Sequence, residues 1–170
     1  SYIGPYRPEY AFSFIAKAGA HLEVEDSTLS RCGYGTDVGE RGLTTYANFT
    51  SVENCLIVGS RVGLEVIGAW NVSIRNCRFV NCSDWDVSCF NAHNLTLVGN
   101  SFSGPVLVCN STHITLADNA FSSDNQVGFL FDHLTGLAEF KNNTVAGKPI
   151  LLVNSTTGLT VSGEFGQVIV

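Results

Sequence analysis

The chain has 170 residues, 45% of them apolar and 14% charged, and its formal net charge is −6. The apolar fraction excludes a disordered chain, and an acidic balance without a cluster of Lys and Arg argues against nucleic-acid binding. Because no run of about 18 or more apolar residues is present, no membrane span is expected.

Residues 1–15 are expected to form an extended arm with a first strand, and residues 16–170 a single domain of repeated units. The segment Ser1–Pro8 contains two prolines, including Pro5. Proline fixes φ and lacks a backbone donor, so this arm is not expected to form a helical cap.

From residue 16 onward the chain repeats a short pattern. The segments that begin at Asn71, Asn94 and His113 read NVSIRNCRF, NLTLVGNSF and HITLADNAF. Each contains a turn residue, an alternating strand, Cys or Asn, and then Phe. The alternation predicts a strand with one face inward and one outward. With weaker copies included, the anchor positions of this strand are Val24, Val52, Ile74, Leu97, Leu116, Phe140 and Val161.

Successive anchors are 19–28 residues apart, and a second short apolar run lies between them. Such a unit cannot bury its own apolar face, but stacked units share one continuous core. The pattern predicts an all-β, right-handed, single-stranded parallel β-helix (a β-solenoid) of about seven coils. The Asn after the strand predicts an internal ladder of stacked amides. The second runs are 43–46, 62–66, 87–90, 106–109, 127–131, 150–153 and 168–170.

Other repeat folds fit this pattern less well. A leucine-rich repeat needs a helix or its equivalent in each unit, and no segment shows an apolar period of about 3.6 residues. The copies instead resemble the parallel β-helix repeats of pectate-lyase-like proteins, including carbohydrate-binding and sugar-hydrolase domains and NosD-like periplasmic proteins. The resemblance covers roughly residues 20–165 and implies the fold. It selects no function, because this fold carries lyases, hydrolases, adhesins, tailspikes and inert shafts.

Four of the six cysteines are expected to form two disulfides between neighbouring coils. Cys55 and Cys77 occupy the same repeat position on adjacent coils. Stacked coils lie about 4.8 Å apart, within the Cα separation that a disulfide needs. Cys89 and Cys109 lie in the second strands of adjacent coils and are expected to bridge in the same way.

The remaining cysteines, Cys32 and Cys82, are two coils apart, which is too far for rigid strands. However, Cys32 lies in the longest insertion, 30–41, which could fold over to complete a third disulfide. The glycine-rich part of this insertion, 32–37, is expected to be a surface loop. Zinc ligation is the alternative for the cysteines, but no Cys-x-x-Cys motif and no suitable His partner support it.

Seven Asn-x-Ser/Thr sequons exceed the two or three that chance predicts from 14 Asn and 29 Ser plus Thr. Together with six cysteines and a start at Ser1 without any Met, they predict a secreted or cell-surface glycoprotein whose signal peptide has been removed. The alternative is that repeat geometry places Asn at turns and creates sequons by accident. The sequon residues are Asn48, Asn71, Asn81, Asn94, Asn110, Asn142 and Asn154.

No catalytic residue, metal or cofactor is predicted. The clustered aspartates and Gly-His-Gly of polygalacturonase-like hydrolases are absent. Two carboxylates on one face can support acid–base chemistry, but they more often form a solvated strand face. The carboxylates considered are Glu23, Glu25, Asp84, Asp86, Asp118 and Asp132.

The histidines His93, His113 and His133 recur every twenty residues, which suggests a metal-binding column. Their distances from the following strand differ, so they are expected to occupy turns without converging. Trp70 and Trp85 could form a platform for stacking sugars, although packing at an edge is the simpler expectation.

The ends of the predicted solenoid look uncapped, and an open solenoid end is a template for another strand. We therefore expect a structural subunit that binds copies of itself end to end in an extracellular filament or surface layer. A carbohydrate-binding or polysaccharide-processing β-helix is the alternative, and a trimeric spike or adhesin is a third. The residues expected to mediate self-assembly are Tyr2, Ile3, Tyr6, Phe165, Val168, Ile169 and Val170.

Overall fold

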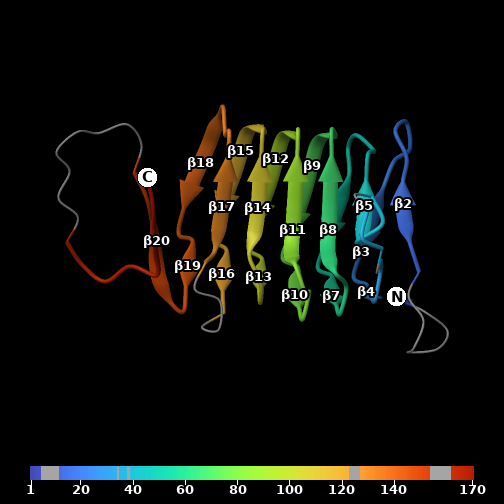
Figure 1. The fold of residues 1–170 in the computed structure, drawn as a ribbon, viewed down its shortest axis with the longest axis horizontal. Helices are drawn as coiled ribbons and strands as arrows, with labels where there is room; N and C mark the ends of the chain where they lie inside the picture. Colours follow the sequence, from blue (N-terminus) through green and yellow to red (C-terminus); the bar gives the residue numbers. More distant parts are fainter. Residues whose placement is uncertain (5–11, 34, 38, 123–126, 154–161) are drawn as a thin grey trace.

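The chain folds into a stack of short β-strands. Figure 1 shows the strands side by side along the long axis, with the two ends of the chain at opposite ends of the stack. The described part of the chain contains 21 strands, and none of it lies in a helix long and apolar enough to cross a membrane. The computed structural model describes residues 1–4, 12–33, 35–37, 39–122, 127–153 and 162–170.

Three sheets form the faces of the stack. The first, which we name the β9 sheet, contains β3 (Glu23–Glu25), β6 (Ser51–Glu53), β9 (Trp70–Arg75), β12 (His93–Val98), β15 (Thr112–Ala117) and β18 (Leu137–Lys141). The second, the β8 sheet, contains β2 (Phe14–Ala16), β5 (Leu43–Thr45), β8 (Val62–Ile67), β11 (Trp85–Phe90), β14 (Val106–Cys109) and β17 (Phe129–Asp132). The nine-stranded sheet contains β1 (Tyr2–Ile3), β4 (Thr28–Ser30), β7 (Leu56–Val58), β10 (Arg78–Val80), β13 (Ser101–Phe102), β16 (Ala120–Phe121), β19 (Thr144–Val145), β20 (Lys148–Leu152) and β21 (Gln167–Ile169).

The chain visits the three sheets in the same order on each turn, and neighbouring turns pair in parallel. The predicted parallel solenoid is therefore confirmed, with about six turns in place of seven. The difference arises after β19, because Ala146 and Gly147 both have positive φ, 51° and 74°. Two such residues form a tight hairpin turn. As a result β20, expected as a second strand of a regular coil, runs antiparallel to β19.

The interior consists of stacked side chains from equivalent positions. Phe79, Phe102 and Phe121 stack with ring centroids 5.2 and 5.0 Å apart. Leu, Ile and Val fill the inward positions of the β9 sheet, as the alternation in the sequence predicts. Repetition of one shape on each turn lets the layers fill the core without voids.

The predicted amide ladder is confirmed. The side chains of Asn100, Asn119 and Asn143 are buried, and the Nδ2 of Asn119 donates to the Leu97 carbonyl at 2.8 Å. The Oδ1 of Asn119 accepts from the backbone N–H of Asn100 at 3.1 Å. Each amide thus pairs backbone groups at a turn that would otherwise be buried without a partner.

Candidate functional site

Trp70 is a large apolar side chain that the fold leaves 58% exposed. It begins β9, at the corner where the chain passes from the β8 sheet to the β9 sheet. Its register partner on the next turn is His93, whose own partner on the following turn is Thr112. On the preceding turn, Oδ1 of Asn48 accepts a hydrogen bond from the Trp70 backbone N–H at 2.9 Å. A column of side chains therefore follows this corner.

A second column lies one residue further along and has left-handed backbone. Its members are Phe49, Asn71, Asn94 and His113, with φ of 58°, 56°, 55° and 55°. Asn tolerates this conformation, whereas a bulky side chain rarely adopts it. Phe49 is nevertheless placed there with 63% of its surface exposed.

The rings of Trp70, His93 and His113 lie close together on three successive turns. Trp70 and His93 have ring centroids 5.3 Å apart, and His93 and His113 5.6 Å. On the preceding turn, the backbone N–H of Phe49 donates to the Trp70 carbonyl at 2.8 Å. We name Phe49, Trp70, His93 and His113 the aromatic ridge.

The expectation that the histidines do not converge is wrong for His93 and His113. The Thr112 hydroxyl lies 3.3 Å from Nδ1 of His93 and 2.7 Å from Nδ1 of His113. The two rings meet because His93 lies opposite Thr112 on the next turn, and His113 is the residue after Thr112. His133 instead contacts the carboxylate of Asp132 at 2.6 Å.

Beside the aromatic ridge, the outward positions of the β9 sheet carry a column of hydroxyls. Ser51, Ser73, Thr96 and Thr115 are register partners on successive turns, and all four are half-buried. Nε of Arg75 donates to the Ser73 hydroxyl at 2.9 Å. Aromatic faces and hydroxyl groups therefore lie side by side along several turns of the stack.

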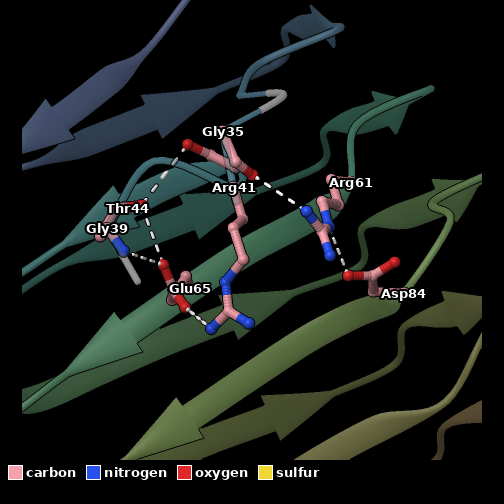
Figure 2. A network of polar contacts seen from close by, with 8 residues as sticks. Gly35, Gly39, Arg41, Thr44, Arg61, Glu65 and Asp84 are labelled. Atoms are coloured by element: carbon pink, nitrogen blue, oxygen red, sulfur yellow. Dashed lines mark hydrogen bonds and ion pairs between the residues drawn. The ribbon is translucent and has the colours of Figure 1, made fainter. Parts of the chain in front are cut away.

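A second polar cluster lies on the outer face of the β8 sheet (Figure 2). The side chain of Glu65, in β8, is 0% exposed and pairs with Arg41 at 2.5 Å. It also accepts hydrogen bonds from the Gly39 backbone N–H at 2.7 Å and the Thr44 hydroxyl at 3.4 Å. A buried carboxylate needs such compensation, so this network ties the insertion before β5 to the sheet.

A second ion pair ties the same insertion down. Nε of Arg61 contacts Asp84 at 2.6 Å, and Nη1 of Arg61 donates to the Gly35 carbonyl at 3.4 Å (Figure 2). The expected surface loop therefore covers the β8 sheet, with Thr36 and Asp37 exposed. These charged groups hold backbone segments in place, so we assign them a structural role.

The three-sheet architecture agrees with one comparison with known proteins. The sequence profile of a family described as "Right handed beta helix region" matches residues 13–165. The chain belongs to this right-handed β-helix family. No curated protein matches the chain. Among solved structures, QnrB1, a plasmid-mediated fluoroquinolone resistance protein, is 12% identical over 74% of this chain and 92% of that chain, with a TM-score of 0.17. A TM-score this low does not establish a shared fold.

The carboxylates considered for catalysis lie at different corners of this β-helix. Asp86 is buried at the start of β11, where burial raises its pKa, and it accepts a hydrogen bond from the Gly104 N–H at 2.5 Å. Asp118 follows β15 and accepts from the Asn142 amide, while Asp132 ends β17. Glu23 and Glu25 point outward from β3. The described carboxylates therefore do not converge on one groove.

The β-helix brings Cys55 and Cys77 together, as their shared repeat position predicts. The interaction between their side chains lowers the pKa of Cys55 and raises that of Cys77. Both cysteines are free thiols that occupy the position of the amide ladder. The Sγ of Cys77 lies 3.4 Å from the Val52 carbonyl, where an Asn on later turns donates. Their disulfide stays a prediction.

The structure does not bring Cys89 and Cys109 together. Cys89 is opposite Val108, and Cys109 is opposite Phe90, so the two side chains point to opposite faces of the β8 sheet. A shift of one residue changes the face of a strand side chain, which makes this expected disulfide wrong.

Cys32 and Cys82 are free thiols like the other cysteines, and their disulfide stays a prediction. Cys32 pairs with Phe12 in an isolated bridge, while the thiol of Cys82 interacts with the Asp86 carboxylate. The insertion folds over the outer face of the sheet, but its ion pairs hold it over Glu65.

The sequon asparagines lie at the surface. Asn48, Asn81, Asn94, Asn110 and Asn142 are exposed and Asn71 is half-buried, while Asn154 lies outside the described residues. Five of these six have positive φ, which explains Asn at these positions by turn geometry. Exposure makes glycan attachment sterically possible, and glycosylation stays a prediction.

The residues expected at the ends lie mostly in the terminal strands of the nine-stranded sheet. Ile3 is half-buried in β1, and Ile169 is half-buried in β21. Tyr2, Val168 and Val170 are exposed, Phe165 is half-buried, and Tyr6 lies outside the described residues. A mainly apolar cleft of about 330 Å³ lies beside β21, and its described lining is Phe131, Leu134, Thr135, Gly136, Leu137, Leu152, Val153, Ile169 and Val170.

Sequence reasoning overlooked the ion pair between Glu65 and Arg41 and the exposed Phe49. The ion pair had a signal in the sequence: Glu65 is an acidic residue inside the apolar run 62–66, and a charge in a buried strand needs a partner. Phe49 stands beside a sequon asparagine, and no signal in the sequence separates it from core phenylalanines.

Proposed function

We propose that this β-helix binds a linear polysaccharide along the aromatic ridge. The observation that carries the proposal is the exposed indole of Trp70, which lies against His93 in a column that follows the stack. An exposed aromatic cluster of this kind is typical of a binding surface. We also propose that the protein is secreted, since five of its sequon asparagines are exposed.

The arrangement suits a sugar chain for two physical reasons. The C–H face of a sugar ring packs on the electron-rich face of an aromatic ring. The neighbouring Ser73, Thr96 and Thr115 present hydroxyls that exchange hydrogen bonds with sugar hydroxyls. Both sets repeat at the spacing of the turns, about 4.8 Å, so the ligand is expected to lie parallel to the long axis.

The backbone of Phe49 supports the same surface. A left-handed conformation costs a bulky residue about 1–2 kcal/mol, whereas Asn adopts it readily. Asn occupies the equivalent position on the next two turns, at Asn71 and Asn94. An exposed Phe in this conformation is therefore strained, and such strain is concentrated at functional sites.

We expect Trp70→Ala to weaken polysaccharide binding about tenfold or more, because loss of one aromatic contact of about 1.4 kcal/mol has this effect. Binding is measured by titration calorimetry with a panel of neutral and acidic soluble polysaccharides. Protein without N-linked glycans is used, so that no glycan at Asn48, Asn71 or Asn94 contributes to the measured binding.

Trp85→Phe is the control, because Trp85 is half-buried at the start of β11 and lies outside the ridge. Equal affinities of Trp70→Ala and the unchanged protein for every bound polysaccharide would contradict the proposal, as would failure of the whole panel to bind. The intact mass of the secreted protein, before and after removal of N-linked glycans, tests secretion and glycosylation in parallel.

End-to-end self-assembly is the second candidate. It is favoured by the position of β1 and β21, which are the two edge strands of the same nine-stranded sheet. Unpaired backbone groups on two edges of one sheet can pair between copies and continue without closing. Ile3 and Val168 add apolar side chains at the two edges.

Val168→Lys is expected to reduce self-association strongly, because an exposed charge on an edge strand opposes pairing with another strand. Light scattering over a range of protein concentrations measures the effect, with Val127→Lys as a control at an exposed site outside β21. An unchanged protein that stays monomeric at high concentration rules out this candidate.

A further inference from the structure

Two histidines of the aromatic ridge and the adjoining Thr112 bring three donor atoms close together. Nδ1 of His93 and Nδ1 of His113 both point at Oγ1 of Thr112, at 3.3 and 2.7 Å. The imidazole rings come from adjacent strands and are tilted by 58° with respect to each other. We propose that these three atoms form a surface site for a divalent transition-metal ion such as Ni²⁺, Cu²⁺ or Zn²⁺, completed by water.

The distances match those of a coordination shell. Metal–nitrogen bonds of about 2.1 Å place neighbouring ligands about 3.0 Å apart in an octahedron and about 3.4 Å apart in a tetrahedron. The two N···O separations, 3.3 and 2.7 Å, lie close to these values. In the metal-free protein the Thr112 hydroxyl donates to Nδ1 of one ring and accepts from Nδ1–H of the other, and this second ring moves its proton to Nε2 when a metal binds.

The chemistry of the donors selects the class of metal. Imidazole suits Ni²⁺, Cu²⁺ and Zn²⁺, whereas Ca²⁺ and Mg²⁺ prefer oxygen ligands. Binding uses neutral rings with the proton on Nε2, so any imidazolium present releases its proton as the metal binds. The net charge of the chain, −6, further favours a cation. This site does not depend on polysaccharide binding.

One other cluster on the described surface competes for such an ion. The carboxylate of Asp132 contacts His133 at 2.6 Å and Cys109 at 3.4 Å. His133 contacts Oδ1 of Asp132 and Cys109 contacts Oδ2, whereas His93 and His113 contact the same Thr112 oxygen. Substitution of His133 separates the two sites experimentally.

The test is a titration of the full chain with Ni²⁺, followed by calorimetry and by tryptophan fluorescence. Protein without N-linked glycans is used, because substitution of His113 or His133 by Asn creates an Asn-x-Thr sequon. Trp70 lies 5.3 Å from His93, so bound Ni²⁺ is expected to quench its emission. His113→Asn is expected to weaken Ni²⁺ binding by at least the roughly tenfold to hundredfold that even an outer-shell change causes. Asn preserves the left-handed backbone at this position.

His133→Asn is the matched control, because His133 is also exposed and has a φ of 53°. This variant is expected to bind Ni²⁺ as the unchanged protein does, whereas His93→Gln is expected to behave like His113→Asn. In Trp70→Phe, calorimetric binding persists and the quenching is lost. Absence of saturable Ni²⁺ binding overturns the proposal, and so does loss of binding in His133→Asn with retention in His113→Asn.

Discussion

Arg41→Ala is expected to lower the free energy of unfolding by about 3–5 kcal/mol, the usual effect of leaving a buried charge without its partner. Glu65 is 0% exposed, and Arg41 is only 16% exposed, so water replaces little of the lost interaction. Urea unfolding followed by circular dichroism measures the change.

Arg61→Ala is the control for this substitution. The side chains of Arg61 and Asp84 are 33% and 30% exposed, so solvent stabilises the remaining carboxylate and a loss of about 1 kcal/mol or less is expected. The double variant Arg41→Met with Glu65→Gln should recover much of the lost stability, because an uncharged amide still accepts from Gly39. Equal losses in Arg41→Ala and Arg61→Ala would show that Glu65 does not depend on this partner.

Phe102→Ala is expected to destabilise the protein by about 3–5 kcal/mol, because it leaves a cavity in a continuous core. Phe102 is buried and stacks on Phe79 and Phe121 of the two neighbouring turns, so both lose contacts. The urea midpoint and the thermal midpoint should both fall.

The exposed Phe49 provides the matched control for the core substitution. Phe49→Asn removes an aromatic side chain of the same size, but the new residue suits the left-handed backbone. No loss of stability is therefore expected. A loss in Phe49→Asn as large as that in Phe102→Ala would contradict the distinction between ridge and core.

The amino-acid sequence was sufficient for the solenoid, the amide ladder and the position shared by Cys55 and Cys77. Each of these depends on one residue type that recurs at one position of a repeat, as Asn100 and Asn119 do. Stacking of identical units converts such a recurrence into contact along the axis. Because the units repeat, these long-range contacts can be predicted from the sequence.

Several side-chain contacts could not be predicted from residue types that recur along the repeat. Cys89 and Cys109 seemed equivalent in the sequence, but a difference of one residue in register puts them on opposite faces. His93 and His113 occupy different repeat positions and still meet at the Thr112 hydroxyl. Spacing along the chain does not determine such contacts. The corners between strands differ in length, and their length decides which residues lie opposite each other on neighbouring turns.

By itself, the sequence determined the fold class, the parallel stacking and the ladder of buried amides, because hydrophobic alternation and turn-by-turn repetition act locally. Only the tertiary structure decided that the insertion lies over Glu65, that the chain reverses after β19 and that Trp70 stands beside two histidines. These outcomes depend on side-chain registers and corner conformations across different turns, which a pattern of residue types does not specify.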